Sequence, residues 1–235
     1  MFYILKNPAT AKSYQKMIQT CKYFFIKNPI IVSADFPHPY SFDFDKWYIG
    51  KTRFDFSQLI CKFWITENFN FTSILPKIYK FDAKNVTLMI KVISLNDLSM
   101  FTKTAEDITF IEVTVKNPDD SVVPFEKIFD AFVKATEFKF YSYSTLTNFT
   151  SKTFNELLKI PHFSKLQLFY LKNIPDTFDI ETFYVYMKKN KTTKFYLRFD
   201  RSISARYKIR LEEIIDEIHG TKEFYYKTPL ISFDR

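Results

Sequence analysis

The stretch Lys194-Phe195-Tyr196-Leu197 has an apolar–x–apolar pattern, which is typical of a β-strand with one buried face. The same pattern recurs along the last two thirds of the chain, at residues 88–90, 111–113, 137–140, 165–168 and 223–226. The first apolar residues of the last four stretches are Phe138, Leu166, Phe195 and Phe224, which are 28 or 29 residues apart. A nearly constant interval of this length indicates an internal repeat.

Helical patterns lie between these strands, because apolar residues follow one another at i, i+3, i+4 and i+7 spacing. The expected helices cover residues 97–103, 125–132, 154–158, 180–187 and 211–218. Asp179 and Ser204 are suited to cap the last two, and Gly220 is expected to end the last helix in a left-handed conformation. The order therefore alternates strand and helix from about residue 86 to residue 228, and strands joined through a helix are expected to run parallel.

Two architectures fit this order of elements, an open curved solenoid and a compact doubly wound sheet. The constant interval favours the solenoid, in which each unit contacts only its neighbours. The stretch from Leu166 to Ile174, LQLFYLKNI, resembles the strand of a leucine-rich repeat followed by its asparagine turn. The other units have Phe or Tyr in place of Leu and no asparagine ladder. We therefore expect an α/β fold, an irregular leucine-rich-repeat-like strand–helix solenoid with a parallel sheet, preceded by a small helical N-terminal segment.

An amphipathic helix is expected over residues 10–25, and Asn28 and Pro29 end it. Its apolar face consists of Tyr14, Met17, Ile18, Cys21 and Phe25. Residues 30–32 then predict a short buried strand.

The segment 14–25 resembles the last helix of an F-box. Residues 21–30, CKYFFIKNPI, are similar to the opening of a large nematode family, whose members join an F-box-like N-terminus to divergent leucine-rich repeats. The resemblance implies a substrate receptor of a cullin ubiquitin ligase, in which the helix face just named binds the Skp-type linker subunit and the repeats bind the target. Because only residues 1–8 precede the helix, we expect the three-helix box to be incomplete. The alternative is that this helix caps the end of the repeat stack.

The chain is thus divided into residues 1–34, a partial F-box-like segment or cap; 35–84, an irregular aromatic-rich connection or degenerate repeats; and 85–235, the repeat domain. Within the connection, Trp47 and Tyr48 suggest a strand, and residues 56–65 and 74–79 suggest helices.

Composition excludes several functions. The chain has 235 residues and only 2 Gly, which excludes the usual phosphate-binding loops. The 29 Phe and 15 Tyr reflect either an A/T-rich gene or an aromatic binding surface.

Both cysteines lie in apolar patterns and are expected to be buried free thiols, which favours an intracellular location, cytoplasmic or nuclear. The net charge is +8, but basic and acidic residues are interspersed, which does not favour nucleic-acid binding, and we expect no membrane-spanning segment.

We find no catalytic, cofactor-binding or metal-binding constellation in the sequence. The three histidines, His38, His162 and His219, have no partner at metal-ligand spacing. Asp43 and Asp45 could share one side of an extended segment, but aspartates are also common in turns. We therefore expect a protein that is not an enzyme and has no cofactor.

The expected function is that of a protein-binding scaffold, an F-box-type receptor or a truncated relative of one. The first alternative is a stand-alone interaction module without linker binding, and the second is nucleic-acid binding. On each hypothesis the candidate surface is the exposed face of the parallel sheet, expected to carry Lys139, Tyr141, Gln167, Phe169, Tyr196, Arg198 and Tyr225. A slip of one residue in strand phase would invert these assignments.

Overall fold

The computed structural model of the chain describes residues 8–35, 47–49, 52–54, 59–69 and 75–233. The chain divides into two compact units, residues 1–86 and 87–235. His38, Asp43 and Asp45 lie outside the described residues.

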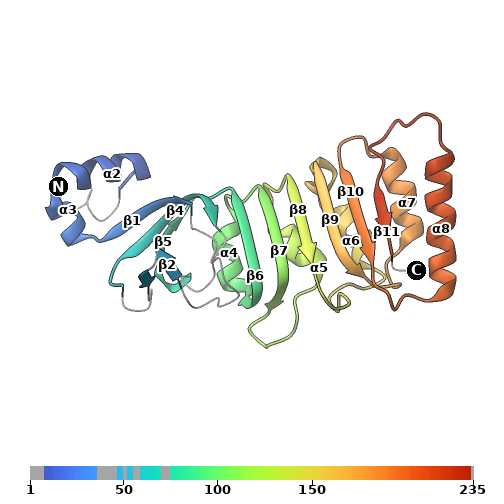
Figure 1. The fold of residues 1–235 in the computed structure, drawn as a ribbon, viewed down its shortest axis with the longest axis horizontal. Helices are drawn as coiled ribbons and strands as arrows, with labels where there is room; N and C mark the ends of the chain where they lie inside the picture. The colour runs from blue at the N-terminus through green and yellow to red at the C-terminus, as the bar shows by residue number, and fades with distance from the viewer. Residues whose placement is uncertain (1–7, 36–46, 50–51, 55–58, 70–74, 234–235) are drawn as a thin grey trace. The chain divides into compact units, whose positions relative to one another are not determined.

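The second unit alternates strands and helices, and its sheet strands are neighbours in chain order (Figure 1). The elements are β6 (Asn85–Ser94), α4 (Leu95–Thr102), β7 (Asp107–Lys116), α5 (Phe125–Asp130), β8 (Glu137–Tyr141), α6 (Thr153–Lys159), the 3-10 turn η3 (Phe163–Lys165), β9 (Leu168–Ile174), α7 (Ile180–Lys189), β10 (Lys194–Phe199), α8 (Ala205–Gly220) and β11 (Leu230–Ser232). Strands β7 to β11 pair in parallel. The expected α/β class with a mostly parallel sheet is therefore confirmed.

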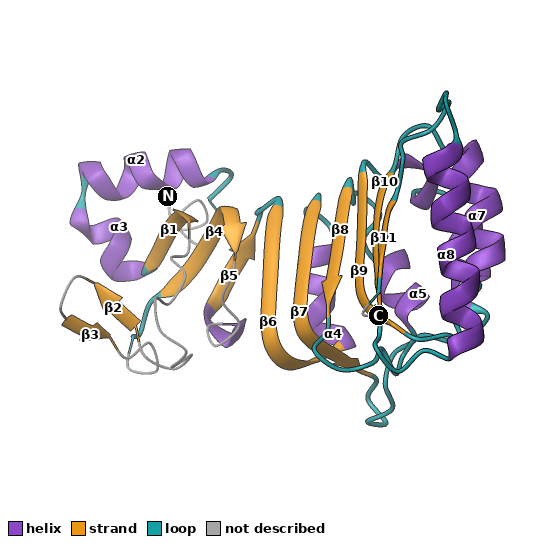
Figure 2. Cartoon of the chain, turned by 45° about the vertical axis from the view of Figure 1, so that its right-hand side comes forward, coloured by secondary structure: helices purple, strands orange, loops and turns teal. Residues whose placement is uncertain are grey.

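The helices of this unit lie on one side of its sheet (Figure 2). Between the helices and the sheet lies a core of phenylalanine side chains, with the Phe138 ring 5.2 Å from Phe129, 5.8 Å from Phe110 and 5.9 Å from Phe125. Edge-to-face pairs of this kind stabilise a core beyond their apolar area. Among the residues whose burial the structure describes, eighteen phenylalanines are buried, so these aromatic side chains serve packing.

The strand interval is less regular than the sequence suggests. In register, Ile108 lies opposite Phe138, Phe138 opposite Phe169, and Phe169 opposite Phe195, which gives intervals of 30, 31 and 26 residues. The constant interval of 28 or 29 residues is therefore wrong. Leu166 is buried, but it lies between the 3-10 turn and the start of β9 at Leu168. Leu166 and Leu168 therefore alternate as strand residues do, although Leu166 is not part of the strand.

The final expected strand, residues 223–226, is also wrong. This segment forms no strand, and the last one is β11, whose Ile231 lies opposite Leu197, 34 residues earlier. The caps Asp179 and Ser204 are confirmed, since each side chain accepts a hydrogen bond from the backbone of its helix. Gly220 is the last residue of α8 and is not left-handed, so that expectation is wrong.

In the first unit, β1 (Ile30–Asp35), β4 (Lys62–Phe69) and β5 (Ile78–Phe81) form parallel pairs with β4 in the middle. β2 (Trp47–Ile49) and β3 (Thr52–Phe54) form an antiparallel pair, and a 3-10 turn, η2 (Leu75–Lys77), precedes β5. The strands expected at 30–32 and at Trp47 and Tyr48 are confirmed. The helices expected over 56–65 and 74–79 are wrong.

The N-terminal helix is divided in two, α2 (Ala11–Thr20) and α3 (Lys22–Lys27), because Cys21 is extended, with φ −154° and ψ 120°. Tyr14, Ile30 and Trp64 form the buried cluster against which α2 packs. Cys61 is buried as expected, whereas Cys21 is exposed, so the expectation of a buried thiol there is wrong.

Candidate binding surface

The strands of the second unit present alternate side chains to the helices and to the opposite side of the sheet. Phe138, Phe169 and Phe195 point to the helix side and are buried. We call the opposite side the open face, because no helix of this unit covers it among the described residues (Figure 2). Where β7 to β10 pair with one another, its strand positions are Asp107, Thr109, Ile111, Glu137, Lys139, Tyr141, Leu168, Tyr170, Lys172, Lys194, Tyr196 and Arg198.

Three tyrosines of the open face stack across neighbouring strands. The rings of Tyr141 and Tyr170 are 4.4 Å apart with an interplanar angle of 28°, and those of Tyr170 and Tyr196 are 6.0 Å apart at 26°. We call these residues the tyrosine row. Burial, and to a smaller extent Tyr170, raises the pKa of Tyr141 above its ordinary value.

The charges of the open face are unevenly distributed. On β7 and β8 the Lys139 ammonium lies 3.0 Å from Asp107 and 2.7 Å from Glu137. Burial lowers the pKa of Lys139, but the hydrogen bonds and charges of the two carboxylates raise it above its ordinary value. On β9 and β10 the open-face positions contain three bases, Lys172, Lys194 and Arg198, and no acid.

A rigid turn follows β8 at the edge of this face. Glu112 on β7 and Asn173 on β9 both have a left-handed backbone, with φ 54° and 63°. The Glu112 carboxylate accepts a hydrogen bond from the Tyr143 N–H, and the Asn173 amide donates to the Ser142 carbonyl at 2.7 Å. The turn therefore holds Tyr143, which is 70% exposed, with the Lys172 ammonium 5.1 Å from its ring centroid.

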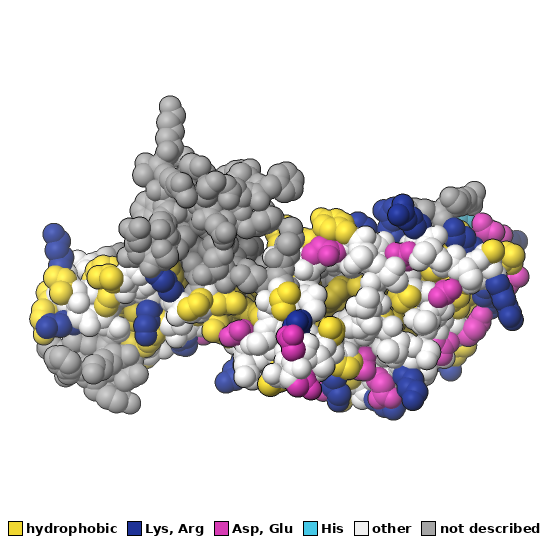
Figure 3. All heavy atoms as spheres, turned by 90° about the horizontal axis from the view of Figure 1, so that it is seen from below, with side chains coloured by type: hydrophobic (Ala, Val, Ile, Leu, Met, Phe, Trp, Pro, Cys, Tyr) yellow, Lys and Arg dark blue, Asp and Glu magenta, His cyan; other side chains and the backbone are white. Residues whose placement is uncertain are grey.

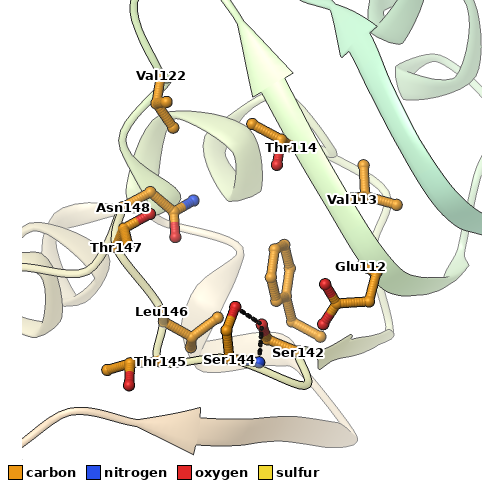
Figure 4. A pocket seen from close by; sticks show the side chains of 11 residues that line it. Glu112, Val113, Thr114, Val122, Ser142, Ser144, Thr145, Leu146, Thr147 and Asn148 are labelled. Carbon is orange, nitrogen blue, oxygen red and sulfur yellow. Dashed lines mark hydrogen bonds between the residues drawn. The ribbon is translucent and has the colours of Figure 1, made fainter.

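A small polar cavity of about 80 Å³ lies beside this turn, where β7 continues past the end of β8 (Figure 4). Glu112 and Thr114 face Ser142, Ser144 and Asn148 across it. The Ser144 N–H donates to the Ser142 hydroxyl at 3.3 Å. Pockets for cofactors or drug-sized ligands are several times larger, so this cavity suits water or the tip of one side chain.

Several of the predicted surface residues occupy the open face: Lys139, Tyr141, Tyr196 and Arg198. Gln167 is exposed immediately before β9, and Tyr225 is 76% exposed but lies outside any strand. Phe169 is 1% exposed and belongs to the helix side, so its predicted exposure is wrong. The error follows from the strand predicted two residues too early, around Leu166. For the same reason Tyr170 and Lys172 were not predicted to lie on the exposed face.

The predicted linker-binding residues are split by the break at Cys21. Tyr14 is buried, its hydroxyl donates to the Asn28 carbonyl and accepts from the Ile30 N–H, and it is not accessible to a partner. Met17 and Ile18 are half-buried, whereas Cys21 and Phe25 are exposed. On α3, Tyr23 and Ile26 are exposed beside Phe25, and Ile26 is 72% exposed.

The histidines that the structure describes make packing contacts or lie on the surface. The His162 ring stacks on Phe129 at 4.9 Å, and its Nε2 lies 3.3 Å from the Phe129 carbonyl. His219 is exposed in the last turn of α8. Within the described ranges, no three His, Cys, Asp or Glu side chains gather as metal ligands would.

On the side of the second unit seen in Figure 3, basic and acidic side chains are interspersed. None of the helices in the described part of the chain has the length and apolar character needed to cross a membrane. Comparison with known protein families, with curated proteins and with solved structures found no match.

Proposed function

We propose that this chain is a non-enzymatic protein-binding scaffold, built as an irregular strand–helix solenoid, which binds its partner on the open face. The observation that carries the proposal is the tyrosine row on the open face. Tyrosine combines a large apolar ring with a hydroxyl and loses little side-chain entropy on binding, which is why it is enriched at protein interfaces.

The stacking geometry favours a protein over a nucleic acid. Binding of single strands without sequence preference needs free aromatic faces on which bases stack. Tyr170 instead has Tyr141 and Tyr196 as stacking partners, and the Lys194 ammonium lies 5.7 Å from the Tyr196 ring centroid. A row stacked in this way presents ring edges and hydroxyls, which suit the mixed surface of a protein.

Bonds between successive strand–helix units support the solenoid. The Thr193 hydroxyl, two residues before Phe195, donates to the Leu166 carbonyl at 2.8 Å, and the Thr136 hydroxyl, two residues before Phe138, donates to the Glu106 carbonyl at 3.2 Å. Equivalent positions thus bond to the preceding unit, as stacked repeats do.

Affinity capture from extracts of the source cells tests the proposal. Proteins captured by the unmodified chain should be lost when Tyr141, Tyr170 and Tyr196 are changed together to Ala. They should be retained when Val133 and Val185, which are exposed outside the open face, are changed to Ala. Circular dichroism establishes that both variants are folded. Equal capture by both variants would contradict the proposal.

A second candidate, an F-box-type receptor, is favoured by the exposed apolar side chains of α3. A six-residue helix with no buried residue that exposes Tyr23, Phe25 and Ile26 gains from being covered by a partner. In this candidate the Skp-type linker subunit would contact Met17, Ile18, Cys21 and Phe25, without Tyr14.

Co-purification with the Skp-type linker subunit tests this candidate. Binding should weaken in the variants Phe25→Ser and Cys21→Ser and persist in Lys12→Ser, on the exposed side of α2. The absence of association would leave only the scaffold, and association that survives both substitutions would mean that this segment is not the contact.

A further inference from the structure

The positive half of the open face determines which kind of protein segment it suits. The open-face positions of β9 and β10 include the bases Lys172 and Lys194, and no acid stands at an open-face position of these two strands. Bases without an acid among them raise the local potential together. We propose that this half, through Lys172 and Lys194, binds the carboxylates of an acidic segment of the protein partner. This inference rests on the proposed function.

The contacts of the two lysines leave their positive charge in place. Lys172 lies over the Tyr143 ring at 5.1 Å, and Lys194 lies over the Tyr196 ring at 5.7 Å and donates to the Thr228 carbonyl. Rings and carbonyls orient an ammonium group without neutralising it. The open-face lysine of β8, Lys139, has two carboxylate partners and adds no such charge.

The surroundings of these bases suit carboxylate side chains carried on a peptide. Tyr170 and Tyr196 lie in register on these strands, with Lys194 two residues before Tyr196 and Lys172 two residues after Tyr170, and Tyr143 is held at the edge by Glu112 and Asn173. On the β7 and β8 half, Thr109 and Ile111 lie on the same face as the cluster of Asp107, Lys139 and Glu137, in which two acids surround one base. The acidic part of the segment is therefore expected on β9 and β10.

Fluorescence anisotropy with labelled peptides tests this inference on the full chain. The probes are a ten-residue peptide alternating Glu and Ser, its Gln–Ser and Lys–Ser counterparts, and an oligothymidylate of equal length. The Glu–Ser peptide should bind at least about tenfold more tightly than the Gln–Ser peptide at low ionic strength and weaken at physiological ionic strength. The Lys–Ser peptide should not bind.

Variants locate the site. Lys172→Gln and Lys194→Gln should each weaken binding of the Glu–Ser peptide about threefold to tenfold, whereas Lys134→Gln, an exposed lysine after α5, should leave it unchanged. Circular dichroism establishes that each variant is folded.

Equal binding of the Glu–Ser and Gln–Ser peptides, or unchanged binding in both open-face variants, would overturn the inference. Tighter binding of the oligothymidylate with the same dependence on Lys172 would replace the acidic peptide with nucleic acid. If the tyrosine row is needed for capture of cellular proteins but the Glu–Ser peptide does not bind, the scaffold stands and the acidic partner does not.

Discussion

Glu112 and Asn173 hold opposite ends of one peptide group, between Ser142 and Tyr143, although they lie on different strands. The Glu112 carboxylate accepts from the Tyr143 N–H, and the Asn173 amide donates to the Ser142 carbonyl at 2.7 Å. Both residues are left-handed, a conformation that costs most residues energy and that persists only where surrounding contacts hold it. The contribution of this arrangement is to fix the turn that presents Tyr143 beside the open face.

Substitution of Asn173 separates its hydrogen bond from its backbone conformation. Asn173→Gly should lower the free energy of unfolding by about 1 kcal/mol through loss of the bond to Ser142. Asn173→Ala should lower it by about 1 kcal/mol more, because alanine is strained at positive φ and glycine is not. Urea unfolding followed by circular dichroism measures both, and equal losses would show that φ is not constrained in solution.

The phase of β9 can be tested with two neighbouring residues. Phe169→Ala should lower the free energy of unfolding by about 3–5 kcal/mol, because it leaves a cavity in the phenylalanine core. Tyr170→Ala removes an open-face side chain and should cost about 1 kcal/mol, through its stacking contacts. Similar losses for both variants, or a larger loss for Tyr170→Ala, would place the strand in the opposite phase.

The cap of α7 should contribute a pH-dependent part of the stability. Burial raises the pKa of Asp179, but hydrogen bonds from Thr182 and Asn155 lower it by more than burial raises it. The pKa of Asp179 in the folded state therefore lies below the ordinary 3.8. The stabilisation is therefore present above pH 3.8 and is lost as the pH falls through the lower folded-state value. Asp179→Ala should cost about 1 kcal/mol at neutral pH, and the difference from the unmodified chain should shrink in acid.

Asp179→Asn is the matched control, because asparagine also caps helices but does not titrate. Neither variant has the titrating carboxylate, so the differences of Asp179→Ala and Asp179→Asn from the unmodified chain should change with pH by the same amount, while the stability of one variant relative to the other stays constant. Urea unfolding at a series of pH values measures both variants. A constant difference between Asp179→Ala and the unmodified chain down to the lowest pH would mean that the carboxylate charge is not what stabilises the cap.

The two cysteines should differ in reactivity. Cys21 is exposed at the break between α2 and α3, and Cys61 is 7% exposed in front of β4. A thiol reagent should modify one group in the folded chain and the second only after unfolding, and Cys21→Ser should abolish the first reaction. Rapid modification of both thiols in the folded protein would contradict the packing of the first unit.

The alternation of strands and helices in the second unit was predictable, because apolar residues repeat with the period of each element. Some features depend only on residues close in sequence, and these were identified: the caps Asp179 and Ser204, and the apolar face of α5. The phase of β9 was not predictable in the same way, because Leu166 and Leu168 alternate like strand residues although a turn lies before Leu168.

β4 was mistaken for a helix for a different reason. Phe63, Trp64 and Ile65 are buried one after another, so this strand is covered on both faces and shows no alternation. Apolar runs of this kind do not distinguish a buried strand from a helix. Two of the three tyrosines in the row, Tyr141 and Tyr196, were predicted from the sequence. The pairing of Glu112 with Tyr143 depends on a long-range contact and an uncommon φ that no local pattern signals.

Photo-crosslinking tests the central claim, that the open face is the binding surface, most directly. A p-benzoylphenylalanine residue is placed in turn at Tyr141 and Tyr196 on the open face and at Val133 and Val185 outside it, and extracts of the source cells are irradiated. We expect the same protein adducts from both tyrosine positions and none of them from the valine positions. Adducts from Val133 or Val185 alone, or adducts of nucleic acid from Tyr196, would contradict the claim.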